Sequence, residues 1–148
     1  MSIEIERKFL VKNLGFIKES HSKKLIIQGY LSKDPDRTVR VRIEEKKAFL
    51  TVKSKSFDNG TSRLEIENKI SIKDAKELMK ICVSQPIKKI RYIIIKNEFT
   101  FEVDVFKNTN EGLIIAEIEL NSKDLKFPKP DWLGREVTGK KEFYNSQL

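Results

Sequence analysis

Residues 3–8 read Ile3-Glu-Ile-Glu-Arg-Lys8, and the fold and site predicted for this chain are organised around them. The alternation of polar and apolar residues predicts a β-strand that projects Glu4, Glu6 and Lys8 from one face. Two carboxylates about 7 Å apart on such a face can share a hard cation, and a lysine one step further can meet an anion. Taken alone, the stretch fits a solvated strand face even better. Its meaning therefore depends on the other strands.

The composition favours a charge-rich globular domain with polyanionic partners. The chain has 148 residues, 39% hydrophobic and 35% charged, with a net charge of +8 and a pI near 9.5. This length suits one domain over residues 1–148, and the charge favours nucleic acid, phosphates or an anionic membrane surface without choosing among them.

The residues that the chain lacks exclude several kinds of chemistry. Cys82 is the single cysteine, which excludes an internal disulfide and a cysteine metal cluster. His21 is the single histidine and lies in a polar segment, which argues against histidine metal sites and catalytic triads. Acidic residues stand where a signal peptide needs positive and apolar ones, and no apolar run reaches transmembrane length. We expect a cytoplasmic protein with no membrane contact.

The hydrophobic pattern predicts a mainly β protein with some helix, of the α+β class. Period-two alternation predicts eight strands, at residues 3–8, 25–31, 39–43, 48–56, 63–69, 87–96, 99–106 and 113–120. Asp58-Asn-Gly60 is a strong hairpin signal, and Ser71 to Val83 has the N-cap and period of a long helix. Shorter helical turns are predicted at 15–20, 131–134 and 140–146. Hairpin connections favour a closed or nearly closed antiparallel eight-stranded barrel with helices outside.

Several predicted strands carry charges of a single sign on one face. Three strands carry acidic pairs and three carry basic pairs: Glu4 and Glu6, Glu102 and Asp104, Glu117 and Glu119, against Arg40 and Arg42, Lys53 and Lys55, Lys89 and Arg91. Like charges two apart on a strand repel, so this pattern favours a site in which a cation and an anion lie side by side. Carboxylates would bind Mg²⁺ or Mn²⁺, and Arg and Lys would bind phosphate oxygens.

Two arrangements of these faces remain open from the pattern alone. The charged faces either point to solvent around a conventional apolar core, or line the inside of the barrel. In the second arrangement the apolar faces point outward and must be covered by the long helix, the C-terminal segment or a second subunit. That arrangement predicts a homodimer.

The chain also resembles a known family over essentially its whole length. Glu4-x-Glu6-x-Lys8 is similar to the ExExK signature of the CYTH superfamily, the triphosphate tunnel metalloenzymes. Further similar segments follow in the expected order, at Gln28–Leu31, Thr38–Ile43, Leu50–Lys53, Lys89–Tyr92, Phe101–Phe106, Gly112–Leu120, Trp132–Thr138 and Tyr144-Asn145. Asn68-Lys-Ile-Ser71 departs from the family pattern at the end of its strand. ExExK alone is weak, whereas the ordered set is specific for the short bacterial branch.

The resemblance implies a barrel with a charged interior that binds a triphosphate and a divalent metal, and it implies roles for individual residues. The implied metal ligands are Glu4, Glu6, Glu117 and Glu119, with Asp104 as a further ligand or an orienting acid. The implied substrate-binding residues are Lys8, Arg40, Arg42, Lys53, Lys89 and Arg91. Glu65 and Glu67 match an Arg-x-Glu-x-Glu strand and would bind a second metal or position water, so that they and Lys89 are the candidate catalytic residues.

The leading functional hypothesis is metal-dependent hydrolysis of a linear triphosphate, foremost inorganic tripolyphosphate. Relatives in the same superfamily make thiamine triphosphatase, nucleoside triphosphatase and adenylate cyclase the enzymatic alternatives. A non-catalytic polyphosphate or RNA-binding module is the alternative from another class. Clustered carboxylates argue against it because uncompensated acids repel a polyanion. The aromatic residues lie mostly on the presumed packing faces, which argues against nucleic acid.

Overall fold

The computed structural model describes residues 2–148 and contains one sheet of nine strands with short helices. The strands are β1 (Ser2–Val11), β2 (Ser22–Ser32), β3 (Arg37–Glu44), β4 (Lys47–Ser54), β5 (Ser62–Ile70), β6 (Ile87–Lys96), β7 (Phe99–Phe106), β8 (Ile114–Glu119) and β9 (Leu133–Glu136). The α-helices are α1 (Phe16–Glu19) and α2 (Ile72–Lys80), and three 3₁₀ turns are η1 (Asn108–Asn110), η2 (Lys141–Phe143) and η3 (Asn145–Gln147). The short helix expected at 15–20 is therefore confirmed.

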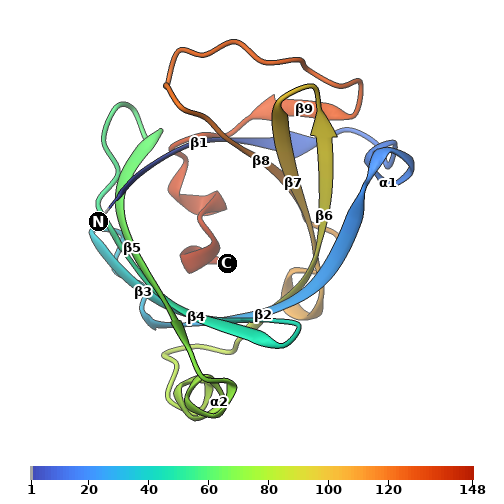
Figure 1. Cartoon of the computed structure of the whole chain (residues 1–148). Coiled ribbons are helices and arrows are strands. Elements are labelled where there is room, and N and C mark those ends of the chain that lie inside the picture. The colour runs from blue at the N-terminus through green and yellow to red at the C-terminus, as the bar shows by residue number, and fades with distance from the viewer. Residues whose placement is uncertain (1) are drawn as a thin grey trace.

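Eight of the strands close into an antiparallel barrel, as predicted (Figure 1). They follow the order β5-β4-β3-β2-β6-β7-β8-β1, and β1 completes the ring by pairing with β5. β1 does so by dividing its length, with Ser2–Ile5 opposite β5 and Glu6–Leu10 opposite β8. The ExExK stretch therefore lies at the closure of the barrel, in contact with strands that are distant in the sequence.

The polar faces of the strands point into the barrel and the apolar faces point out. Charged residues are among the most buried side chains, with Lys89 0%, Asp104 1%, Arg91 6% and Lys8 7% exposed. On β1, Phe9 belongs to an apolar cluster outside the barrel, whereas its neighbour Lys8 lines the internal pocket. The second of the two arrangements left open by the sequence is the observed one.

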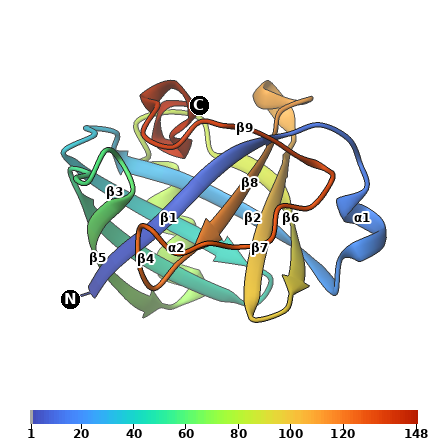
Figure 2. The same cartoon turned by 90° about the horizontal axis from the view of Figure 1, so that it is seen from above.

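Two parts of the chain cover most of the apolar outer surface: α1 with the connection after β8, and α2. Phe16 of α1, together with Phe127 and Trp132 from the long connection after β8, packs against the outer face of β1, β6, β7 and β8. Figure 2 shows this connection running across the outside of the barrel. α2 covers β3 and β4, where its Ala75 is fully buried against Val41 and Ala48.

α2 begins as the sequence predicts and ends earlier. The Ser71 hydroxyl accepts a hydrogen bond from the Asp74 backbone N–H at 3.0 Å, as expected of an N-cap. The helix ends at Lys80, and Cys82 packs beyond it in a non-helical segment. Gly29 of β2 makes this packing possible, because a Cβ there would lie 2.4 Å from the Cys82 sulfur.

Two expectations about the C-terminal region are wrong. Residues 131–134 do not form a helix: a single turn, closed by a hydrogen bond from the Leu133 N–H to the Pro130 carbonyl at 3.0 Å, leads directly into β9, which pairs with β1 through Phe9 and Val11. The segment 140–146 forms two 3₁₀ turns instead of one helix. Seen along the barrel in Figure 1, this dark red segment falls inside the ring of strands, and Figure 2 shows that it lies at one end of the barrel. Its placement turns out to matter for the site.

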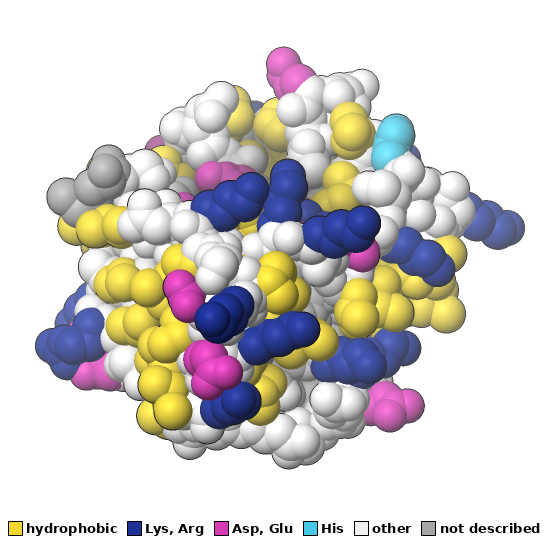
Figure 3. Space-filling view, turned by 60° about the horizontal axis from the view of Figure 1, so that its bottom comes forward, with side chains coloured by type: hydrophobic (Ala, Val, Ile, Leu, Met, Phe, Trp, Pro, Cys, Tyr) yellow, Lys and Arg dark blue, Asp and Glu magenta, His cyan; other side chains and the backbone are white. Residues whose placement is uncertain are grey.

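One outward apolar area is not covered within residues 2–148. Ile3 of β1, Val52 of β4, and Leu64 and Ile66 of β5 are between 37% and 57% exposed on adjacent strands. The expected homodimer stays a prediction. The face that carries α2 is different, with Lys and Arg side chains spread among apolar ones (Figure 3). No helix in the described part of the chain has the length and apolar character needed to cross a membrane.

Candidate active site

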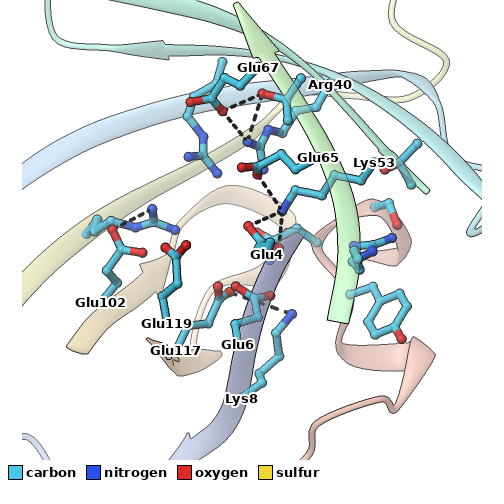
Figure 4. Close-up of a pocket in the computed structure, with 18 of the residues that line it drawn as sticks. Glu4, Glu6, Lys8, Arg40, Lys53, Glu65, Glu67, Glu102, Glu117 and Glu119 are labelled. Carbon is cyan, nitrogen blue, oxygen red and sulfur yellow. Dashed lines mark hydrogen bonds and ion pairs between the residues drawn. The ribbon is translucent and has the colours of Figure 1, made fainter. Parts of the chain in front are cut away.

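The inside of the barrel encloses a polar pocket of about 270 Å³ (Figure 4). Its charged lining is balanced in number. The acidic lining residues are Glu4, Glu6, Glu44, Glu65, Glu67, Glu102, Glu117 and Glu119, and the basic ones are Lys8, Lys24, Arg40, Arg42, Lys53, Arg63, Lys89 and Arg91. A pocket for a polyanion alone would carry an excess of positive charge, and a pocket for cations alone an excess of negative charge. Equal numbers of both suit a cation and an anion bound together.

The acidic side of the pocket is formed by β1 and β8. Glu6 lies directly opposite Glu119 in the antiparallel ladder, and Glu117 lies opposite Lys8. Figure 4 shows the side chains of Glu6, Glu117 and Glu119 grouped below Glu4. Burial and the nearby Glu117 and Glu4 carboxylates raise the pKa of Glu6 well above its ordinary value. A cation bound among these acids would relieve that repulsion.

The four acids Glu4, Glu6, Glu117 and Glu119 are chemically suited to bind Mg²⁺ or Mn²⁺. All four acids supply carboxylate oxygens, the ligands that these hard cations prefer. Within residues 2–148, no three carboxylate, imidazole or thiol groups already stand at metal-binding geometry. Two lysines lie near these acids, with Lys53 Nζ 2.9 Å from Glu4 Oε1 and Lys8 Nζ 3.8 Å from Glu117 Oε1. A metal bound to Glu4 would compete with the Lys53 ammonium group for the carboxylate oxygens.

The basic side of the pocket is formed by β3, β4 and β6. Arg40 and Arg42 project inward from β3, each less than a tenth exposed. Arg40 Nη2 lies 3.3 Å from the Thr51 hydroxyl oxygen, and Arg42 Nε donates to Gln28 Oε1 at 3.0 Å. Burial and the neighbouring Arg40 and Arg91 lower the pKa of Arg42 to about 10, so that it stays charged at neutral pH. These guanidinium groups can bind phosphate oxygens.

Asp104 organises two of the cations. Its Oδ1 accepts from Arg91 Nε at 2.7 Å, and its Oδ2 accepts from Arg91 Nη2 at 2.9 Å and lies 2.7 Å from Lys89 Nζ. Burial opposes ionisation, yet Arg91 and Lys89 hold the pKa of Asp104 far below its ordinary value. Asp104 does not line the pocket. Of the two roles expected for Asp104, these contacts favour orientation of the cations over metal ligation.

Glu65 and Glu67 project from β5 into the same pocket with different contacts. Glu65 Oε2 lies 3.7 Å from Lys53 Nζ, and burial together with Glu4 raises the pKa of Glu65 to about 7. Glu67 Oε2 accepts a 2.7 Å hydrogen bond from Thr51 Oγ1 and lies 3.5 Å from Arg40 Nη2. The two acids thus face Lys53 and Arg40, two of the cations expected to bind phosphate.

All of the predicted site residues except Asp104 line the pocket, and Lys55 is the other member of the charge pattern that does not. Asp104 lies just behind the lining, in contact with Lys89 and Arg91. Lys55 was grouped with Lys53 on a charged face, but β4 ends at Ser54 and Lys55 is exposed. The like-signed pair expected on this strand is therefore reduced to Lys53.

Sequence reasoning assigned no role to several other lining residues. Tyr30, Arg63, Thr138, Gly139, Tyr144, Asn145 and Ser146 also line the pocket. Five of them follow β9, in a part of the chain where no strand alternation shows which side chains face inward. Tyr30, Arg63, Thr138 and Tyr144-Asn145 lie in segments similar to the family pattern, but that similarity implied no function for them.

The fold and the pocket together define an antiparallel β-barrel protein with a charged internal site. The family model described as "CYTH domain" matches residues 2–147. The chain belongs to the CYTH family.

Similar proteins match nearly from end to end. The chain is 46% identical to an inorganic triphosphatase from Acetivibrio thermocellus over 149 residues, covering 100% of this chain and 94% of that protein. It is 35% identical to an inorganic triphosphatase from Nitrosomonas europaea, covering 98% and 95%. A crystal structure of an inorganic triphosphatase is similar with a TM-score of 0.68 and 30% identity, covering 97% and 95%.

Proposed function

We propose that this protein is a metal-dependent phosphohydrolase that cleaves a linear triphosphate, with inorganic tripolyphosphate as the leading substrate. The observation that carries the proposal is the balanced pocket, in which eight acidic and eight basic side chains face one another inside a closed barrel. Two relatives that match over nearly their whole length, both inorganic triphosphatases, support it.

In this proposal the acidic side of the pocket binds the metal and the basic side binds the substrate. Glu4, Glu6, Glu117 and Glu119 would hold Mg²⁺ or Mn²⁺. A metal bound there would neutralise negative charge on the transferred phosphoryl group. The substrate would be bound by Lys8, Arg40, Arg42, Lys53, Lys89 and Arg91. Because these cations come from four strands of a rigid barrel, they hold the phosphate chain in one orientation.

The reaction needs a positioned water and a stabilised leaving group. The water oxygen attacks a terminal phosphorus, the bond from that phosphorus to its bridging oxygen breaks, and orthophosphate and diphosphate result. Glu65 accepts the proton of the attacking water, with Glu67 orienting it, since both carboxylates project into the pocket from β5. Lys89 is 0% exposed and serves both to bind the substrate and to stabilise charge on the reacting phosphoryl oxygens.

Phosphate release tests the proposal directly. Tripolyphosphate, thiamine triphosphate and ATP are each incubated with Mg²⁺, Mn²⁺ or EDTA, and the ATP reactions are also analysed for cyclic AMP. We expect metal-dependent phosphate release that is fastest with tripolyphosphate. If none of the three is turned over with either metal, the protein is not this enzyme, whereas cyclic AMP as the main product would make it a cyclase.

A further inference from the structure

We infer that Asn145, in the C-terminal segment (residues 140–148), is a positioning residue. Its side chain orients two cations expected to bind phosphate, Lys89 and Arg42, without neutralising their charge. The inference rests on the proposed function and adds to it a residue from outside the strands. Asn145 Oδ1 accepts hydrogen bonds from Lys89 Nζ at 2.8 Å and from Gln28 Nε2 at 3.0 Å. Gln28 Oε1 in turn accepts from Arg42 Nε at 3.0 Å.

The direction of this chain of hydrogen bonds is fixed by Arg42. Its guanidinium group carries only donors, so the Gln28 atom that faces it must be the amide oxygen. The Gln28 amide nitrogen is then left to donate to Asn145. Gln28 is 0% exposed and directly opposite Arg42 in the ladder between β2 and β3, so it has no freedom to turn away. One oxygen of the C-terminal segment thus controls both cations.

The C-terminal segment is anchored at other points, so Asn145 is not needed to hold it in place. Phe143 and Leu148 pack on Tyr30, Ile87, Phe106 and Ile115. The Phe143 carbonyl oxygen accepts a hydrogen bond from Lys8 Nζ at 3.0 Å, and the Tyr144 hydroxyl lies 3.2 Å from the Ser56 hydroxyl oxygen. The Asn145 amide therefore has a fixed backbone from which to position Lys89.

A neutral amide suits this position better than a carboxylate. An amide oxygen orients an ammonium or guanidinium group without adding a negative charge beside it. A carboxylate in the same place would compete with the substrate for the cation. Lys89 already has Asp104 as its one close carboxylate, 2.7 Å away. A second anion beside it would also upset the balance of eight acidic and eight basic lining side chains. Binding of a polyanion would then be disfavoured.

The test compares Asn145→Asp, Asn145→Ala and the control Gln147→Ala, which removes a contact of the same segment outside the pocket. Tripolyphosphate binding is measured by calorimetry in EDTA, kcat and KM with Mg²⁺, and thermal unfolding for each variant. We expect Asn145→Asp to unfold as the parent does and to bind tripolyphosphate at least about tenfold more weakly. Asn145→Ala should lower kcat by about tenfold or more, and Gln147→Ala should change neither constant.

The outcomes separate this inference from the proposed function. If the parent protein neither binds nor hydrolyses tripolyphosphate, the proposed function fails. If the parent does both and Asn145→Asp matches it in affinity, KM and kcat, the positioning role is wrong. Losses in Asn145→Ala that only follow a lower unfolding temperature would likewise assign Asn145 a purely structural role. A double variant Gln28→Ala with Asn145→Ala should lose no more activity than the worse single variant, because the two amides act as one unit.

Discussion

Lys53 Nζ lies 2.9 and 3.1 Å from the two carboxylate oxygens of Glu4, so a residue expected to bind phosphate holds a residue expected to bind metal. Both side chains are nearly buried. Burial opposes the ionisation of each, yet their attraction lowers the pKa of Glu4 and raises that of Lys53. The ion pair keeps the two charges compensated within the barrel. A metal that binds Glu4 and a phosphate that binds Lys53 would each replace one half of this pair.

Replacing Lys53 by methionine should therefore have opposite effects on the two ligands. Without the competing ammonium group, Glu4 is free for a cation, and we expect Mn²⁺ to bind about tenfold more tightly in the absence of substrate. KM for tripolyphosphate should rise by about tenfold because one phosphate contact is lost. Calorimetric titration with Mn²⁺ and steady-state kinetics measure the two effects. Lys55→Met, at an exposed position two residues on, should change neither, and unaltered Mn²⁺ affinity in Lys53→Met would contradict the competition.

Glu4→Gln and Arg42→Ala should separate the metal side of the pocket from the phosphate side. Glu4→Gln removes a charged oxygen ligand, and we expect kcat to fall at least about a hundredfold and the metal concentration for half-maximal rate to rise. Arg42→Ala should mainly raise KM, by about tenfold to a hundredfold, with little change in metal dependence. Rate curves against metal and substrate concentration distinguish the two. Full activity in both variants would show that the site is assigned wrongly.

Asp104→Asn tests whether Asp104 orients cations or binds metal. Removing its charge leaves Lys89 and Arg91 buried beside a neutral amide, so the free energy of unfolding should fall by about 3 kcal/mol. Mn²⁺ affinity should change by less than about twofold, whereas Glu117→Gln should weaken it at least about tenfold. Denaturant unfolding and metal titration give both quantities. Equal losses of Mn²⁺ affinity in the two variants would make Asp104 a ligand.

Most strands of the barrel could be predicted because the alternation of polar and apolar residues is visible within each strand. Alternation on β1 and β3 shows which residues share a face, and single-signed charge on those faces favours a site in which a cation and an anion lie side by side. The residues that line the pocket from the strands follow from this. The inside-out arrangement itself could not be derived from alternation, since a solvated charged face has the same pattern.

The C-terminal region could not be predicted in the same way. β9 has four residues and depends on pairing with β1, more than 120 residues earlier, so local propensity says little about it. Tyr144 is held by contacts with Lys8 and Arg63 from two different strands. Such positions depend on tertiary contacts and leave no periodic signal in the sequence.

The ion pair between Arg7 and Glu136 predicts how β9 responds to acid. Arg7 Nε and Nη2 donate to the two Glu136 oxygens at 2.8 and 2.6 Å, and these hydrogen bonds lower the pKa of Glu136. A lowered folded-state pKa contributes stability above the ordinary value near 4.5, and this contribution is lost as the pH falls through the folded-state pKa. Because both side chains are partly exposed, its magnitude is less than about 1 kcal/mol.

Glu136→Gln should thus unfold at a slightly lower temperature than the parent at pH 7 and at the same temperature near pH 2. Thermal unfolding across this pH range measures the difference. Glu142→Gln, at an exposed acid in η2, serves as the control and should match the parent throughout. A Glu136→Gln deficit that persists undiminished at the acid end would mean that the side chain stabilises β9 by packing and not by charge.

Glu6 should show the opposite dependence on pH. It lies opposite Glu119 in the ladder, and burial with the neighbouring carboxylates raises its folded-state pKa well above 4.5. The folded protein therefore holds a proton that the unfolded chain has released, and stability falls as the pH rises from about 4.5 through the folded-state pKa. Below about pH 4.5 both states are protonated and the penalty is absent.

Glu6→Gln removes this penalty and with it a ligand for the cation that would relieve it. In EDTA we expect the variant to be more stable than the parent by at least about 1 kcal/mol at pH 8 and equal to it near pH 4. Millimolar Mg²⁺ should reverse the order at pH 8, because the parent gains binding energy that the variant lacks. Thermal unfolding in the two buffers measures both differences. If Mg²⁺ stabilised parent and variant equally, Glu6 would not belong to the metal site, and the repulsion around it would serve some other purpose.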